Sequence, residues 1–131
     1  IQTELMQGGV IMERISREIK KACDVINPTT NNPGSSLELS IKNGATTTIT
    51  KFSLNGDNIE IYENGSLTST GPLNSPKIKI AGITGLTFTQ LTTIATAPKA
   101  IKIYLEIQSM DNALIKAKFY NTIFLRNNKC S

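Results

Sequence analysis

The sequence predicts a single α+β domain in which an N-terminal amphipathic helix packs on an antiparallel β-sheet. Residues 1–25 carry apolar side chains at helical spacing, whereas the segments within residues 37–126 alternate apolar and polar side chains between turn sequences. No second helical segment lies between the expected strands, so consecutive strands should pair antiparallel. A helix and a sheet that each have one apolar face bury both faces by packing together.

The length and composition fit one compact domain and exclude several kinds of chemistry. The chain has 131 residues, is 39% hydrophobic, and contains no histidine and no tryptophan. Without histidine it has no His general base, no nucleophile–His pair and no His-ligated metal. We therefore expect no enzyme and no cofactor, although hydrolysis by carboxylates alone stays open. The chain as given is expected to be soluble, because no apolar run reaches the ~18 residues that span a bilayer.

The expected helix, residues 1–25, has an apolar face and a charged face. The apolar stripe consists of Ile1, Leu5, Met12, Ile15, Ile19 and Ala22. The opposite face carries Glu4, Glu13, Arg14, Arg17, Glu18, Lys20 and Lys21, in which Glu13 and Arg17 have the i, i+4 spacing of a favourable ion pair. Gly8 and Gly9 cost about 1 kcal/mol each relative to alanine, so either a bend or close packing should compensate. The chain starts inside this helix without a cap, so we expect it to be a fragment that lacks its upstream part.

A series of short strands follows the helix. Residues 27–36 are rich in Pro, Asn, Gly, Ser and Thr and predict an exposed loop, after which Leu37, Leu39 and Ile41 mark the first strand. Residues 47–54 and 58–63 flank an Asn-Gly-Asp turn and predict a β-hairpin. A short piece at residues 67–70 precedes short strands around residues 78–80 and 86–88, and residues 91–98 are ambiguous. Residues 100–108 form the clearest strand, and residues 114–125 should pair with it.

Three segments together resemble the type IV pilin-like family of minor pilins and pseudopilins. They are MQGGVIMERISREIKKACDVI at residues 6–26, FSLNGDNIEIYENG at residues 52–65, and the Leu-Arg-Asn ending at residues 125–127. The resemblance covers essentially the whole chain and implies a pilin-like fold. It also implies prepilin-type N-terminal cleavage and methylation, in which a prepilin peptidase removes a short basic leader from the precursor. The apolar N-terminal helix that would follow this leader is missing from the chain.

The resemblance implies a structural role for the protein. The missing helix would anchor it in the inner or cytoplasmic membrane before assembly, and the subunit would then polymerise with other pilin or pseudopilin subunits into a filament at the cell surface. Such filaments serve adhesion, motility, DNA uptake or secretion. On this interpretation Ile1, Leu5 and Met12 pack between helices of neighbouring subunits, and Arg14, Arg17 and Glu18 form lateral charge pairs.

The two cysteines, Cys23 and Cys130, suit a disulfide in a chain destined for the cell exterior. The resemblance makes such a bond relevant, because a disulfide near the C-terminus is common in the pilin family. Closing so long a loop could stabilise the fold by about 4 to 5 kcal/mol. The alternative is two unpaired thiols, and a catalytic cysteine is disfavoured because no histidine exists to activate it.

Two binding functions stay open beside the structural one. Carboxylates and amides at Asp24, Asn55, Asp57, Asn58, Glu60 and Glu63 could be calcium ligands, but their spacing matches no defined loop. The second possibility is a basic stripe that binds DNA, or an adhesive tip at residues 27–36 and 92–98 that contacts a host surface. Besides the helix cations, its lysines are Lys77, Lys79, Lys99, Lys102, Lys116 and Lys118. Against DNA, we find no aromatic residues alternating with the lysines, and we interpret Tyr62, Tyr104 and Tyr120 as ordinary strand residues.

Overall fold

The computed structural model describes residues 6–91, 99–126 and 130. Its helix, α2, spans Gln7–Lys21 and buries Ile11, Met12, Ile15 and Ile19 along one side. The predicted helix end at residue 25 is wrong. The backbone becomes extended at Ala22, where φ is −73° and ψ is 150°, and strand β1 (Ala22–Asn27) begins there. Because β1 pairs with the next strand, residues 22–25 form hydrogen bonds across a sheet instead of within a helix.

Sheet A contains five strands in the order β1-β2-β3-β4-β5. Its other members are β2 (Ser36–Asn43), β3 (Thr46–Asn55), β4 (Asn58–Tyr62) and the two-residue β5 (Gly71–Pro72). The predicted hairpin around residues 55–57 is present, and Gly56 at its tip has a φ of +60° that favours glycine. The piece predicted at residues 67–70 is not a strand, and β5 follows it instead.

Sheet B is built around the long strand β8 (Ala100–Ser109). One edge of β8 pairs with β9 (Lys116–Phe124), and the other pairs with β6 (Ile78–Ile80) and β7 (Leu86–Leu91). All these pairings are antiparallel, as the sequence predicted. Residues 92–98, which the sequence left ambiguous, lie outside the described part of the chain.

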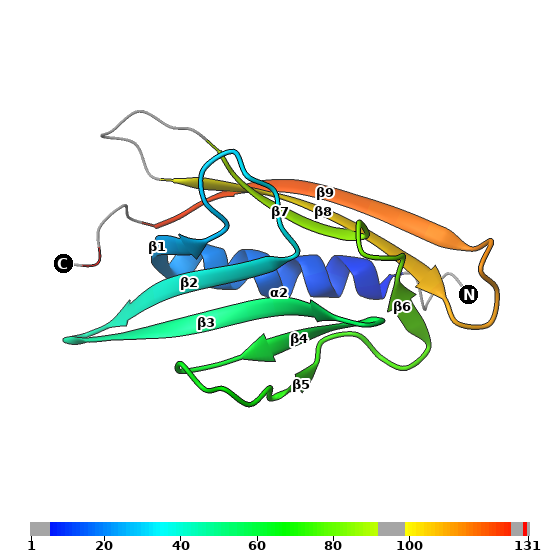
Figure 1. Ribbon diagram of the computed structural model, residues 1–131, viewed down its shortest axis with the longest axis horizontal. Helices are drawn as coiled ribbons and strands as arrows, with labels where there is room; N and C mark the ends of the chain where they lie inside the picture. The colour runs from blue at the N-terminus through cyan, green and yellow to red at the C-terminus, as the bar shows by residue number, and fades with distance from the viewer. Residues whose placement is uncertain (1–5, 92–98, 127–129, 131) are drawn as a thin grey trace.

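The α+β class and the packing of the helix on antiparallel strands are confirmed, but the strands form two sheets instead of the one expected. In Figure 1 the helix runs along the middle of the molecule, with β2 to β5 of sheet A in the lower half and β7 to β9 of sheet B along the top. The segment between β1 and β2 joins the sheets, because Gly34 and Phe88 exchange two backbone hydrogen bonds of 3.0 and 2.7 Å. The predicted loop therefore acts as a connection between sheets.

The core lies between the helix and the inner faces of both sheets. The residues with the lowest exposure come from every layer: Ile15, Ile19, Leu37, Leu39, Phe52, Ile59, Ile78, Phe88, Ile101, Ile103 and Leu105. One buried polar side chain, Asn74, links the sheets at this level. It accepts a hydrogen bond from the Ile59 N–H (3.0 Å) in β4 and donates to the Ile78 carbonyl (3.1 Å) in β6. Both strands thereby obtain partners for backbone groups at the point where the sheets separate.

Close packing, one of the two expected explanations, accounts for Gly8 but not for Gly9. Helix α2 continues through Gly8 and Gly9. Gly8 is buried against the ring of Phe119 on β9, and a Cβ atom at this position would lie only 2.0 Å from Phe119 Cε1. Gly9 is exposed and has no atom within 4 Å of such a Cβ. The absence of a side chain at residue 8 therefore lets the helix approach sheet B.

Candidate interaction surfaces

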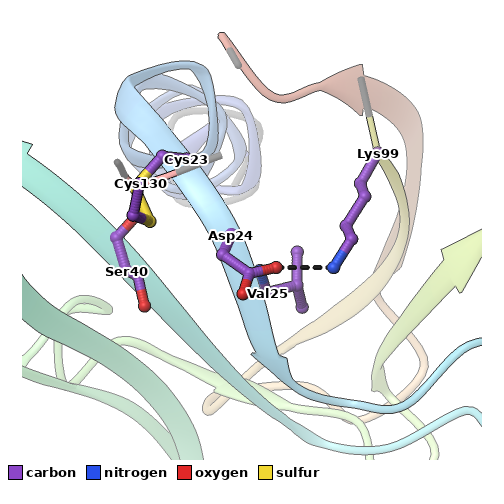
Figure 2. The surroundings of a disulfide bond; sticks show 6 residues. All are labelled: Cys23, Asp24, Val25, Ser40, Lys99 and Cys130. Atoms are coloured by element: carbon purple, nitrogen blue, oxygen red, sulfur yellow. Dashed lines mark hydrogen bonds and ion pairs between the residues drawn. A yellow bond between two sulfur atoms is a disulfide. The ribbon is translucent and has the colours of Figure 1, made fainter. Parts of the chain in front are cut away.

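The disulfide between Cys23 and Cys130 ties the C-terminal tail to the end of the helix. The two Cα atoms are 5.0 Å apart, and the bond joins residues separated by 107 positions (Figure 2). On the same strand, Asp24 Oδ1 accepts hydrogen bonds from Lys99 Nζ (2.5 Å) and from the Val25 N–H (2.8 Å). The predicted disulfide is present, and both cysteines are consumed by it.

The residues predicted to pack in a filament have different environments. Ile1 and Leu5 lie outside the described residues. Met12 is only 7% exposed and belongs to the core of its own domain, so its assignment to packing between subunits is wrong. It follows Ile11 on the side of the helix that faces the sheets, and the intramolecular core already covers it.

The three charged residues predicted for lateral pairing have partners within the chain. Arg14 bonds to Glu63, the residue after β4, at 2.9 Å, and Glu18 bonds to Lys21 at 3.2 Å. Arg17 pairs with Glu13 at 3.0 Å, as the i, i+4 spacing predicted. These partners neutralise each charge locally, so any additional contact with another subunit would compete with them or extend the network.

Two apolar side chains at the start of α2 are exposed instead. Met6 is 71% exposed and Val10 is 68% exposed, and they lie four residues apart, one turn of the helix. We missed Val10 in the sequence because the pattern of Ile11, Ile15 and Ile19 dominates this segment. The signal was present, since a valine at i+4 from a methionine lies on the same side of a helix.

The outer face of sheet B carries lysines and tyrosines from neighbouring strands. Because side chains alternate along a strand, Lys102 and Tyr104 of β8 share this face, as do Lys118 and Tyr120 of β9. The register places Tyr104 directly opposite Tyr120. The expectation that no aromatic residue alternates with the lysines is therefore wrong. The triplets Lys102-Ile103-Tyr104 and Lys118-Phe119-Tyr120 carried the signal, which counting immediate neighbours in the sequence missed.

The two tyrosine rings contact each other beside a shallow hollow of about 320 Å³, lined by Thr87, Thr89, Lys102, Tyr104 and Tyr120. Their centroids are 5.0 Å apart, and the ring planes are tilted by 46°. The Tyr104 hydroxyl donates to Glu106 Oε1 at 3.3 Å. Burial, and then the Glu106 carboxylate, raise the pKa of Tyr104, so its phenol stays protonated to a higher pH than that of an ordinary tyrosine.

The residues considered for calcium do not form a metal site in the described part of the chain. Asp24 pairs with Lys99, Glu63 pairs with Arg14, and Glu60 accepts a hydrogen bond of 2.8 Å from Asn55. Among the described residues, no three Cys, Asp or Glu side chains gather closely enough to hold a metal ion. Hydrogen bonds and ion pairs within the chain thus account for these carboxylates.

Of the two segments predicted to form an adhesive tip, only residues 27–36 lie in the described part of the chain. Backbone bonds to β7 hold residues 28–34 in place, and the Pro28 carbonyl accepts a 2.7 Å hydrogen bond from the side chain of Gln90. Residues 92–98 are outside the described part of the chain. The first loop therefore presents its exposed residues 29–33 and Ser35 to a partner.

Comparison with known proteins gives no relative for this chain. No family model, no curated protein and no solved structure matches it. In the described residues, no helix combines the length and the apolar character that crossing a membrane requires. Its function is therefore inferred from the surfaces of the molecule.

Proposed function

We propose that this chain is the globular domain of a structural minor subunit of a type IV pilus or pseudopilus, which polymerises through its N-terminal helix. The observation that carries the proposal is the exposed apolar pair Met6 and Val10 on the first turns of α2. The rest of the domain suits this role, because the helix is fixed lengthwise against two sheets and a disulfide holds its far end.

The exposed pair can supply part of the energy of assembly. Complete burial of a valine- or methionine-sized side chain stabilises by about 1.5–3 kcal/mol. A neighbouring helix that covered Met6 and Val10 would therefore gain a few kcal/mol at most from the two together. Stable polymerisation needs more buried surface than this, and the proposal places that surface in a preceding apolar helix.

The proposal includes a precursor with a short leader. A prepilin peptidase would remove this leader, and the apolar helix would anchor the subunit in the inner or cytoplasmic membrane until it joins other pilin or pseudopilin subunits in a filament at the cell surface. The gene sequence upstream of the codon for Ile1 tests this directly. A basic leader followed by about 20 apolar residues is expected, and an ordinary signal peptide or a start codon near Ile1 would contradict the filament proposal.

Site-specific photo-crosslinking tests the helix surface itself. A photoreactive amino acid at Val10 should form crosslinks between copies or to another subunit in cells that carry the filament. Leu67 is a matched control, because it is 98% exposed but lines a hollow with Lys51 and Tyr62 of sheet A and with no residue of the helix. Equal crosslinking from both positions, or none from Val10, would count against assembly through this surface.

A second candidate function is a binding module for DNA or for a surface ligand. The lysines and tyrosines on the outer face of sheet B favour it. The two functions are separable, because Val10 lies on the helix whereas this face is directed away from the core. Normal filaments with impaired ligand binding would assign the sheet to the second function.

A further inference from the structure

We propose that the outer face of sheet B is a binding site for single-stranded nucleic acid, with Tyr120 and Tyr104 as the stacking platform and the surrounding lysines as phosphate-binding groups. This inference deepens the second candidate function and does not depend on filament assembly. Three strands that lie side by side in Figure 1, namely β7, β8 and β9, form most of the surface, and β6 adds Lys79 at its edge.

Positive charge is concentrated on this face. The lysines that share the outer face of sheet B are Lys79, Lys102, Lys116 and Lys118, while Glu106 is the single acidic residue in strands β6 to β9. The face thus has a net charge of +3, against +4 for the whole chain. A surface that concentrates most of the excess charge attracts a polyanion, and interactions with phosphate dominate the affinity of proteins for nucleic acids.

A pair of aromatic rings lies among these charges. Tyr120 is 65% exposed, and Tyr104 contacts it from the neighbouring strand with a centroid distance of 5.0 Å. Aromatic side chains on adjacent strands of an antiparallel sheet are a recurrent platform for unpaired bases, because every base offers a flat face to stack on. A duplex keeps its bases stacked inside, so this platform selects a single strand.

The spacing of the charges and the rings suits an extended nucleic acid. Positions two residues apart on a strand are separated by about 6.6 Å. Lys102 therefore lies about one such step along β8 from Tyr104. Lys118 lies about one step along β9 from Tyr120, toward the other end of the strands, because it pairs with Glu106. A nucleic acid extended over the rings meets a cation on both sides of them. The Thr87 and Thr89 hydroxyls beside the rings add hydrogen-bonding groups to the hollow.

Glu106 opposes the binding of phosphate and supplies a test in the direction of gain. It lies opposite Lys118 in the register and accepts the hydrogen bond of the Tyr104 hydroxyl. Glu106→Gln removes the negative charge but can keep that hydrogen bond through its amide oxygen. The variant should bind single-stranded DNA more tightly than the parent, a result that damage to the fold could not produce.

The experiment measures the fluorescence anisotropy of a labelled oligothymidine at several salt concentrations, using the disulfide-bonded chain. Tyr120→Ser should weaken binding by roughly 5-fold to 100-fold, because stacking of one base on an aromatic ring changes the affinity by a factor of this size. The salt dependence should stay the same, because the tyrosine neutralises no phosphate. The double variant Lys102→Gln, Lys118→Gln should weaken binding and reduce the slope of log K against log salt by about 1.4, because each lysine that no longer neutralises a phosphate lowers the slope by about 0.7.

The controls are on the outer face of sheet A. Tyr62→Ser removes a tyrosine that lies under Lys51 Nζ at 5.3 Å, and Lys42→Gln removes an exposed lysine near the end of β2. Neither control should change the affinity by more than about 2-fold. Thermal unfolding of each variant shows whether the fold is retained, and crosslinking from Val10 reports separately on assembly.

Three results would overturn the inference. One is a lack of measurable binding to oligothymidine at low salt. Another is binding that the control variants weaken as much as Tyr120→Ser does. The third is tighter binding of an acidic polysaccharide such as polygalacturonate, together with oligothymidine binding that Tyr120→Ser leaves unchanged, since this would identify a surface that recognises negative charge without stacking.

Discussion

Replacing Gly8 with alanine should destabilise the domain, although alanine is the better helix former. The new Cβ atom would lie 2.0 Å from Phe119 Cε1 and 2.4 Å from Cζ, whereas carbon atoms pack best at about 3.5–4.0 Å. The Phe119 ring must therefore move by about 1.5 Å within a site that packs against the core. Overpacking of this kind costs about 1–3 kcal/mol, while the gain in helix propensity is at most about 1 kcal/mol.

Gly9→Ala is the matched control for this substitution. Gly9 is in the same helical turn, and its Cβ would have no atom within 4 Å, so the change should stabilise the protein by up to about 1 kcal/mol. Because the gain in helix propensity is common to both variants, the free energies of unfolding should differ by about 1–3 kcal/mol, or about 3–10 °C in Tm.

Urea unfolding of the two disulfide-bonded variants measures the difference. A double-mutant cycle with Phe119→Ala isolates the interaction, because Gly8→Ala should become neutral or stabilising once the ring is gone. If Gly8→Ala and Gly9→Ala unfold at the same urea concentration, or if Phe119→Ala leaves their difference unchanged, the glycine is not required by the approach of the ring.

Three other predictions concern the disulfide, the buried amide and a tyrosine. Reduction of the disulfide, or the double substitution Cys23→Ser and Cys130→Ser, should lower the free energy of unfolding by about 2–5 kcal/mol, because the bond closes a loop of 107 residues. Calorimetry of the oxidised and reduced chains measures this loss. Asn74→Ala should destabilise by about 2–3 kcal/mol in urea unfolding, because it leaves a buried N–H and a buried carbonyl without their partner, and a loss below about 0.5 kcal/mol would contradict that role. Folding raises the pKa of Tyr104 above 10.0, so the folded state holds the phenol proton more tightly than the unfolded state does. This group therefore contributes stability below pH 10.0, and that contribution is lost as the pH rises through the higher folded pKa. Tyr104→Phe should flatten this alkaline decline, and an unchanged pH profile would argue against the raised pKa.

The sequence predicted the local elements better than their assembly. Period-two alternation and Asn-Gly turns located the hairpin of β3 and β4 and the long strand β8 correctly. The helix end was missed, because Ala22 and Val25 continue the helical apolar spacing while their backbone pairs with β2. Pairing with a distant strand is decided by tertiary contacts that local periodicity does not contain.

The division into two sheets could not be predicted for the same reason. Strands β4 and β6 both have one buried face, which a single sheet would also satisfy. The separation depends on a few non-local bonds, such as those of Asn74 and the pair of bonds between Gly34 and Phe88. Asparagine and glycine in these segments predicted only turns.

The surfaces were predicted in part. Cysteine content predicted the disulfide, and residue spacing predicted the Glu13–Arg17 pair. Met12 was assigned to the wrong surface because an apolar stripe does not show which partner covers it. The rings of Tyr104 and Tyr120 come together only through the register of β8 with β9, which the sequence of either strand alone does not fix.

The Cys23–Cys130 bond also sets how far this domain can be stretched. If tension is applied between Gln7 and Cys130, only the residues between 7 and 23 can extend, which amounts to about 55 Å of chain, compared with about 420 Å without the bond. Force that enters along the helix would therefore pass through the disulfide to the C-terminal tail and bypass both sheets. A domain held in this way could lose its helix under load and still keep its β-sheets closed within a covalent ring.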